Sequence, residues 1–289
     1  MKFIHMTDTH LVDPGQQLYA VDPAKRLAAA VRSICHEHPD AQFVAITGDL
    51  VQSGQETQYR ALRETLSPLP MPVYLVPGNH DERLAMRRVF PDLAGDRHGY
   101  VQYSVDVTDA RLLFLDTLEP GHSGGVLCAN RLDWLAQELT RSNGRPVHVF
   151  MHHPPLAVGL PVMDCMGLAE PERFWNTLAA HGQNVRHIYF GHLHRPVQGM
   201  INGIGFSCLP GTHHQVCFDI RMAAGDRVPG CHEPPAYGVV AADAQQTVVH
   251  LHKYLDASPR FRLGDREAVD ALSLSDLAIT LAPDTGPAL

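Results

Sequence analysis

The sequence lacks the features that mark several classes of protein. Its six cysteines form no C-x-x-C pair, its N-terminus has no apolar h-region, and no stretch approaches the ~18 apolar residues of a membrane span. Charged residues make up only 19% of the chain and the formal net charge is −8. The chain therefore has no excess of basic residues that would favour nonspecific binding to nucleic acid. We therefore expect a soluble, cytoplasmic protein with no membrane partner and no nucleic-acid partner. A link between Cys217 and Cys231 stays open.

The chain is unusually rich in histidine. There are 19 histidines among 289 residues, against 23 lysines and arginines combined. Hydrophobic residues make up 45% of the chain, which excludes disorder and coiled coil as descriptions of the whole chain. A chain of this length can bury a sizeable core without cross-links to stabilise it. Because histidine titrates near neutrality and is the commonest metal ligand, the positions of these residues decide the interpretation.

Short apolar runs alternate with amphipathic stretches along the chain. Asp22 is a good N-cap for a helix that begins at Pro23 and that Pro39 closes. The first half of the chain has the order of βαβ units, whereas the second half is richer in hairpins, and this mixture predicts two packed sheets with helices outside. We expect strands at 2–6, 42–47, 73–76, 100–107, 111–116, 147–151, 186–190, 197–201, 206–209, 237–242 and 247–254, and helices at 23–38, 55–66, 81–90 and after Asn130.

Two segments stand outside this alternation. Residues 216–236 include a stretch rich in Gly, Pro and charge, and we expect them to form an excursion from the core that acts as a cap or a subunit contact. Residues 256–289 follow the predicted catalytic domain (1–255) as a tail with one short helix and a frayed end.

Polar motifs follow five of the predicted strands, where loops gather ligand-binding groups. Taken singly, each is explained as well by a capped turn or a packed histidine. Five in this order, each at the end of a strand, indicate one common site. They are Asp8-Thr9-His10, Gly48-Asp49 with Gly54, Gly78-Asn79-His80-Asp81, His152-His153-Pro154-Pro155 and Gly191-His192-Leu193-His194.

The residue types in these motifs decide the class of metal. Two Asp, one Asn and four His form a mixed oxygen and nitrogen set without thiolate, which suits Mn, Fe, Co or Zn. Seven ligands are too many for one tetrahedral ion but suit two ions bridged by a carboxylate. Two ions ~3.5–4 Å apart can clamp a phosphoryl group during in-line displacement.

The motifs D-x-H, G-D-x-x-x-x-G, G-N-H-D, H-H-P-P and G-H-x-H, in this order, resemble those of the calcineurin-like metallophosphoesterase superfamily. Within it, residues 150–155 and 209–215 are similar to class III cyclic nucleotide phosphodiesterases and bacterial glycerophosphodiesterases. The resemblance covers about residues 1–255. It implies an α/β (α+β) fold, a four-layer αββα sandwich of two mixed sheets flanked by helices, with a dinuclear site at the strand ends.

The resemblance also implies a role for each motif residue. One metal would be held by Asp8, His10, Asp49 and His194, and the second by Asn79, His152 and His192, with Asp49 as the bridge. His152 is chosen over His153 because the superfamily's ligand stands two residues before a proline, and His153 would then support the ligands. His80 and Asn79 would contact the phosphoryl group, and His80 together with Asp49 would be catalytic. His214 would contact substrate or be a loop histidine near the site.

The function that follows is hydrolysis of small phosphodiesters, cyclic nucleotides or glycerophosphodiesters, by attack of a metal-bound hydroxide. A diester is favoured because no arginine stands inside the motifs, although Arg83 and Arg195 flank them. The alternatives are a phosphomonoesterase or nucleotide pyrophosphatase on the same fold, a nuclease, and a metal-holding interaction module without turnover. A homo-oligomer is a further expectation, through residues 216–236.

Overall fold

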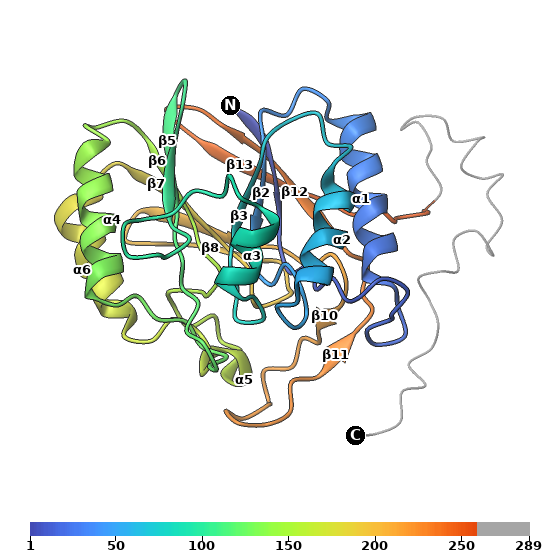
Figure 1. The fold of residues 1–289 in the computed structure, drawn as a ribbon. Helices are drawn as coiled ribbons and strands as arrows, with labels where there is room; N and C mark the ends of the chain where they lie inside the picture. The colour runs from blue at the N-terminus through green and yellow to red at the C-terminus, as the bar shows by residue number, and fades with distance from the viewer. Residues whose placement is uncertain (259–289) are drawn as a thin grey trace, which may run out of the picture. The chain divides into compact units, whose positions relative to one another are not determined.

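The structure is a computed structural model that describes residues 1–258, and Met1–Tyr254 form one compact unit within it. The helix expected in the tail lies outside the described residues. Figure 1 shows this unit with two sheets at its centre. None of the helices in the described part of the chain has the length and apolarity to cross a membrane.

One sheet has five strands in the order β13-β12-β1-β2-β3. Its parallel core is β1 (Lys2–Met6), β2 (Val44–Thr47) and β3 (Val73–Val76), which are buried along most of their length. The strands β12 (Tyr237–Ala242) and β13 (Thr247–His252) continue the sheet antiparallel beyond β1, so the sheet is mixed and β13 is its edge.

The other sheet has six strands in the order β4-β5-β6-β7-β9-β8. Strands β5, β6, β7 and β9 are parallel, whereas β4 and β8 close it as antiparallel hairpin partners. The strands are β4 (Tyr103–Val107), β5 (Ala110–Phe114), β6 (Val147–Phe150), β7 (Val185–Phe190), β8 (Val197–Ile201) and β9 (Ile204–Cys208). A separate short pair, β10 (Gln215–Val216) and β11 (Gly230–Cys231), lies in the expected excursion.

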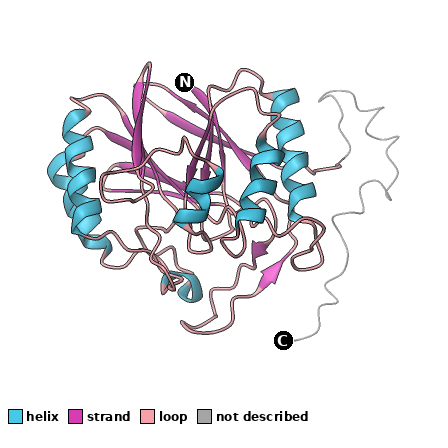
Figure 2. Cartoon of the chain, in the orientation of Figure 1, coloured by secondary structure: helices cyan, strands magenta, loops and turns pink. Residues whose placement is uncertain are grey.

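Helices cover the two outer flanks of the paired sheets (Figure 2). On one flank α1 (Pro23–Glu37) contacts α2 (Glu56–Leu66), which contacts α3 (Arg83–Val89); on the other, α4 (Ala129–Arg141) contacts α6 (Pro171–His181). Between the sheets, the ring of Phe3 on β1 meets that of Phe150 on β6 at 5.8 Å. The two mixed sheets flanked by helices confirm the predicted αββα architecture.

The helices and their ends show which elements the sequence predicted and which it did not. Asp22 caps α1 as predicted, and its carboxylate accepts hydrogen bonds from the N–H groups of Ala24 (3.0 Å) and Lys25 (3.3 Å). The helix expected after Asn130 begins instead at Ala129, with Cys128 as its N-cap. Two helices were not predicted, α6 and the one-turn α5 (Pro161–Asp164).

Candidate metal centre

The carboxyl ends of parallel strands from both sheets carry the residues of the predicted site. Because parallel strands end at the same edge of a sheet, motifs far apart in sequence meet there. All seven predicted metal ligands converge: Asp8 and His10 follow β1, Asp49 follows β2, Asn79 follows β3, His152 follows β6, and His192 and His194 follow β7.

One half of this centre is formed by Asp8, His10, Asp49 and His194, whose ligand atoms all lie within 4.8 Å of one another. The Nε2 atom of His194 lies 3.2 Å from Oδ1 of Asp8 and 3.1 Å from Nε2 of His10. The Nε2 atom of His10 lies 3.6 Å from Oδ2 of Asp49. Four donor atoms thus surround one small volume.

The other half is formed around the side-chain oxygen of Asn79. This Oδ1 atom lies 3.1 Å from Nε2 of His152 and 3.1 Å from Nδ1 of His192. The Nε2 atom of His152 also lies 3.4 Å from Oδ1 of Asp49. Asp49 therefore presents Oδ1 to one half of the centre and Oδ2 to the other, which is the placement that a bridging carboxylate needs.

The backbone is held in an unusual conformation at these positions. Five of the seven residues have positive φ: Asp8 (55°), His10 (46°), Asp49 (47°), His192 (69°) and His194 (48°). They are half of the ten non-glycine residues with positive φ in the described part of the chain. Such conformations cost on the order of 1–3 kcal/mol each and cluster at functional sites, where the surrounding structure imposes them.

Two glycines allow the loops to approach so closely. A Cβ atom on Gly78 would lie 2.3 Å from both N and Oδ1 of Asp49, and one on Gly191 would lie 1.9 Å from Oγ1 of Thr7 and 2.9 Å from Oδ2 of Asp8. All of these distances are shorter than a Cβ atom can approach another heavy atom to which it is not bonded. The glycines of the G-N-H-D and G-H-x-H motifs are therefore required by packing against the acidic residues.

Hydrogen bonds to backbone carbonyls fix the orientation of the imidazoles. The Nδ1 atom of His152 donates to the carbonyl oxygen of Thr47 (2.8 Å), and that of His194 donates to the carbonyl oxygen of His214 (2.8 Å). Since a carbonyl only accepts, the neutral form of each ring carries its proton on Nδ1, and in that form Nε2 offers its lone pair to a cation at the centre.

This arrangement fits a cation. The Nε2 lone pair of His194 faces Nε2 of His10 at 3.1 Å, while Nδ1 of His10 pairs with Oε1 of Gln52 at 2.9 Å. Nε2 of His192 is buried and has no hydrogen-bond partner among the described residues. Facing lone pairs and an orphaned buried nitrogen are unfavourable alone, whereas imidazole, carboxylate and amide donors together suit a borderline metal ion.

The pKa values of these residues also favour a bound cation. Burial would raise the pKa of Asp49, but the neighbouring His152 outweighs it and holds the pKa well below its usual range. Burial alone would lower the pKa of His152, but the Asp49 carboxylate raises it to about 9. Burial lowers the pKa of His10 and of His192 to about 3. Burial thus keeps His10 and His192 neutral, while the charge of the carboxylates raises the pKa of His152, so the carboxylates attract positive charge to the centre.

His80 lies beside Asp49, where the sequence placed it. Its backbone N–H donates to Oδ1 of Asp49 (2.9 Å), and its Nδ1 donates to the carbonyl oxygen of Gln52 (2.9 Å). The rings of His80 and His10 lie 4.9 Å apart. His80 thus lies against both Asp49 and His10, two residues of the same half of the centre.

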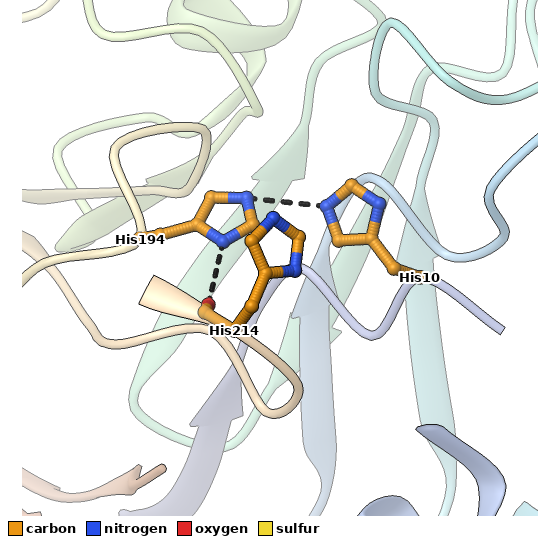
Figure 3. A group of neighbouring side chains, drawn as sticks. All are labelled: His10, His194 and His214. Atoms are coloured by element: carbon orange, nitrogen blue, oxygen red, sulfur yellow. Dashed lines mark hydrogen bonds between the residues drawn. The ribbon is translucent and has the colours of Figure 1, made fainter. Parts of the chain in front are cut away.

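His214 lies at the rim of the centre, as Figure 3 shows for its ring beside those of His10 and His194. The ring centroids are 4.9 Å and 4.4 Å apart respectively. Its ring also meets Tyr19 edge-on at 4.8 Å, and Tyr19 is 61% exposed. This placement allows His214 to contact a bound molecule, and its ring nitrogen could also serve as a ligand.

The second histidine of the H-H-P-P motif has a different environment. The Nδ1 atom of His153 pairs with Oγ1 of Thr117 (2.8 Å) and its Nε2 pairs with the carbonyl oxygen of Ser123 (3.1 Å). Its ring packs edge-on against that of His152 at 4.7 Å. Both ring nitrogens of His153 are thus engaged by protein groups, although one of them also lies within 4.8 Å of ligand atoms of His152 and His192.

Asp81 is a residue whose role the sequence did not reveal. Its buried carboxylate accepts hydrogen bonds from the N–H of Gly78 (2.8 Å), the N–H of Leu50 (3.1 Å) and the hydroxyl of Tyr59 (2.8 Å). Asp81 thus ties the loop after β3 to the loop after β2. The sequence did mark Asp81, because it ends the G-N-H-D motif. Its spacing in the motif does not show whether it binds a metal ion or holds two loops together.

The two arginines that flank the motifs are bound to other protein groups. Arg83 makes a bidentate pair with buried Asp116, with Nε–Oδ2 of 2.6 Å and Nη2–Oδ1 of 2.8 Å. Arg195 donates to the carbonyl oxygen of Val216 (2.6 Å) and lies 3.4 Å from Glu233. Both guanidinium groups thus already bind protein groups, Arg83 through Nε and Nη2 and Arg195 through Nη1.

The structure has two packed sheets, and their strand ends carry a mixed set of oxygen and nitrogen ligands. This combination is typical of proteins with a dinuclear metal site. Residues 1–196 match the family model described as calcineurin-like phosphoesterase, and the chain belongs to this family. It is 41% identical to a probable cyclic nucleotide phosphodiesterase of Rhodopseudomonas palustris, covering 94% of this chain and 100% of that protein.

Two further similarities agree with this assignment. A glycerophosphodiester phosphodiesterase of Enterobacter lignolyticus is 32% identical over 81% of each chain. The solved structure of a dimetal phosphatase from Danio rerio superposes with a TM-score of 0.65 at 16% identity, covering 89% of this chain and 97% of that one. At that identity the superposition supports the fold alone.

Proposed function

We propose that the protein is a metal-dependent phosphodiesterase that hydrolyses small phosphodiesters, with cyclic nucleotides and glycerophosphodiesters as the two candidate classes. The observation that carries the proposal is the position of Asp49, whose two carboxylate oxygens face separate clusters of lone-pair donors. The similarity to a probable cyclic nucleotide phosphodiesterase and to a glycerophosphodiester phosphodiesterase supports the same two classes.

The ligand assignment follows the two halves of the centre. Asp8, His10, Asp49 and His194 would hold one ion, and Asn79, His152 and His192, with Asp49 shared, would hold the other. The donor types favour Mn, Fe, Co or Zn. When bound, two such ions lower the pKa of a water molecule and neutralise charge on the phosphoryl oxygens.

The protein's own groups position the substrate and move protons. Asn79 and His80 lie beside the bridge, and the bond from Nδ1 of His80 to the carbonyl of Gln52 fixes the ring so that Nε2 can hold a proton for the leaving oxygen. General acid help of this kind contributes ~10²–10⁴-fold to the rate. Asp49 is catalytic because it positions both halves of the centre at once.

The leaving group has a place next to the centre. The lining of a cavity of ≈370 Å³ includes Tyr19, His214, Val216, Gly230, Cys231 and His232. His214 belongs both to this cavity and to the cluster with His10 and His194, so a phosphoryl group at the centre would extend its ester substituent into the cavity. We infer that His214 contacts substrate there.

A diester fits the charge of the site better than a monoester does. A monoester carries an additional negative charge, which arginine side chains commonly neutralise. Arg83 is held by Asp116 and Arg195 by Val216 and Glu233, so the cations adjacent to the motifs are already engaged. A singly charged phosphodiester makes no demand for them.

The domain and assembly assignments extend the proposal. Residues 1–255 form the catalytic domain, and residues 216–236 form a cap or subunit contact, which the exposed side chains of Phe218 (66%) and Ile220 (60%) support. We infer a cytoplasmic enzyme with a small-molecule substrate and a homo-oligomeric assembly through this segment.

The test compares two aryl phosphates with Mn²⁺-loaded protein. We expect bis(p-nitrophenyl) phosphate to be hydrolysed with a higher kcat/KM than p-nitrophenyl phosphate, and Asp49→Ala to abolish both activities. A panel of 3′,5′-cyclic nucleotides and glycerophosphodiesters then identifies the class. A preference for the monoester would overturn the diester assignment, and no turnover of either substrate by metal-loaded protein would overturn the proposal.

A further inference from the structure

A second group of potential metal ligands lies between α1 and the edge strand β13, neither of which supplies a residue to the dinuclear centre. Glu37 and His38 stand at the end of α1, and His252 is the last residue of β13. Each offers one ligand atom, and the three atoms all lie within 4.8 Å of one another. We refer to Glu37, His38 and His252 as the α1–β13 triad.

The triad is held in place by its neighbours. Oε1 of Glu37 lies 3.5 Å from Nε2 of His252 and accepts a hydrogen bond from the hydroxyl of Ser33 at 2.7 Å. Ser33 in turn bonds the hydroxyl of Tyr237 at 2.8 Å. The Tyr237 ring lies 4.9 Å from that of His252 and 5.8 Å from that of His38, so one aromatic wall restricts both imidazoles.

The two imidazoles of the triad lie at different angles. The rings of His38 and His252 meet nearly perpendicular, at 88° with centroids 5.8 Å apart. The Nε2 atom of His38 is shielded from solvent and has no hydrogen-bond partner among the described residues. A buried polar atom without a partner costs free energy, and a bound cation with its water ligands would supply one.

The charge around the triad favours a cation. Glu37 supplies a carboxylate, the triad lies at the C-terminal end of α1, where the helix dipole is negative, and the one lysine that acts on His38, Lys2, is paired with Asp40 at 2.6 Å. Two imidazoles and one carboxylate suit Zn²⁺ and its neighbours in the transition series, whereas Mg²⁺ and Ca²⁺ prefer oxygen ligands. Three protein ligands also leave positions for water.

We propose that the α1–β13 triad binds one divalent transition-metal ion of the Zn²⁺ type. This ion would fasten the end of α1 to β13, an edge strand that pairs only with β12 in the five-stranded sheet. Bound metal would therefore hold the edge of the sheet against opening. The proposal does not depend on the phosphodiesterase activity.

The test counts zinc bound to the full-length protein after stripping and dialysis against Zn²⁺. We expect His252→Ala to bind one ion fewer than the wild-type protein, and this difference does not depend on how many ions the dinuclear centre takes up. Two exposed histidines on the same elements provide matched controls: His36→Ala and His250→Ala should bind as many ions as the wild type.

A second readout is thermal. Zn²⁺ should raise the melting temperature of the wild-type protein by more than it raises that of His252→Ala, while diester hydrolysis with Mn²⁺ stays the same in both. Glu37→Gln, which removes the charge and keeps the shape, replaces His252→Ala if that variant does not fold. Equal zinc counts and equal melting shifts in wild type and variant would overturn the proposal.

Discussion

Gly191→Ala places one added methyl group against the residues that hold Asp8. The Cβ atom would lie 1.9 Å from Oγ1 of Thr7, 2.7 Å from the carbonyl oxygen of Thr47 and 2.9 Å from Oδ2 of Asp8. Thr7 can rotate away only by losing its bonds to Oδ2 of Asp8 (2.7 Å) and to the carbonyl of Thr47 (3.2 Å). The Thr47 carbonyl is backbone of a buried strand and has little freedom to move.

The expected magnitudes follow from these contacts. Overpacking costs about 1–3 kcal/mol and each of the two lost hydrogen bonds about 1 kcal/mol, so the free energy of unfolding should fall by about 3–5 kcal/mol. Removing a partner that orients a metal ligand typically weakens metal binding ~10–100-fold, and we expect that loss in Mn²⁺ affinity because Thr7 orients Asp8.

The assay pairs urea denaturation of the metal-free protein with a Mn²⁺ titration. Gly230→Ala is the matched control, because a Cβ atom there meets nothing closer than the carbonyl oxygen of Gln215 at 3.8 Å. Gly230→Ala should retain wild-type stability and affinity. If Gly191→Ala also retains both, the close approach of Gly191 to Asp8 is not what holds the ligand.

Three further predictions concern catalysis, metal and pH. His80→Ala should lower kcat ~10²–10⁴-fold while the metal content measured by mass spectrometry stays the same; lost metal would make His80 structural. Removing the metal with a chelator should lower the free energy of unfolding by ~2.7 kcal/mol for each bound ion whose free concentration was 100 times its Kd. A denaturation curve that the chelator leaves unchanged would contradict two bound ions. Burial lowers the pKa of His148 to about 3, below its value of ~6.5 in the unfolded chain, so only the unfolded state gains this proton as pH falls below 6.5. His148→Phe should therefore flatten the fall in unfolding free energy between pH 5.5 and 4 by up to ~1.4 kcal/mol per pH unit, and a slope identical to wild type would refute this assignment.

The strand ends were predictable because each carries its own signal. An apolar run such as 2–6 or 147–151 followed at once by a polar motif marks the carboxyl end of a buried strand, and parallel strands bring those ends to one edge. The predicted strands at 2–6, 73–76, 197–201 and 237–242 match the structure residue for residue. The convergence of the seven motif residues follows from that topology.

Elements with few core contacts were not predictable. In α6 only Phe174 and Leu178 are buried, too few to establish a helical period, and Glu170 enters the helix in a left-handed conformation that no propensity suggests. Residues 215–216 and 230–231 pair over two residues each, which is shorter than any alternation of apolar and polar residues can reveal.

The positioning contacts were also hidden from the sequence. The motif letters identify Asp81 as part of the site, yet its role as an acceptor for Leu50, Gly78 and Tyr59 depends on where two loops fold. The meeting of His38 and His252 has no motif at all, because it arises from the packing of α1 beside β12 and β13.

The most direct test of a dinuclear phosphodiesterase is the initial rate of bis(p-nitrophenyl) phosphate hydrolysis as Mn²⁺ is added to stripped protein. In the His252→Ala protein, which lacks a ligand of the α1–β13 triad, and with protein well above the dissociation constants, the rate should rise until two ions are present per chain and then level off. Adding Asp49→Ala should abolish this rise. Hydrolysis by the metal-free protein, saturation at one ion, or wild-type activity in Asp49→Ala would contradict the account.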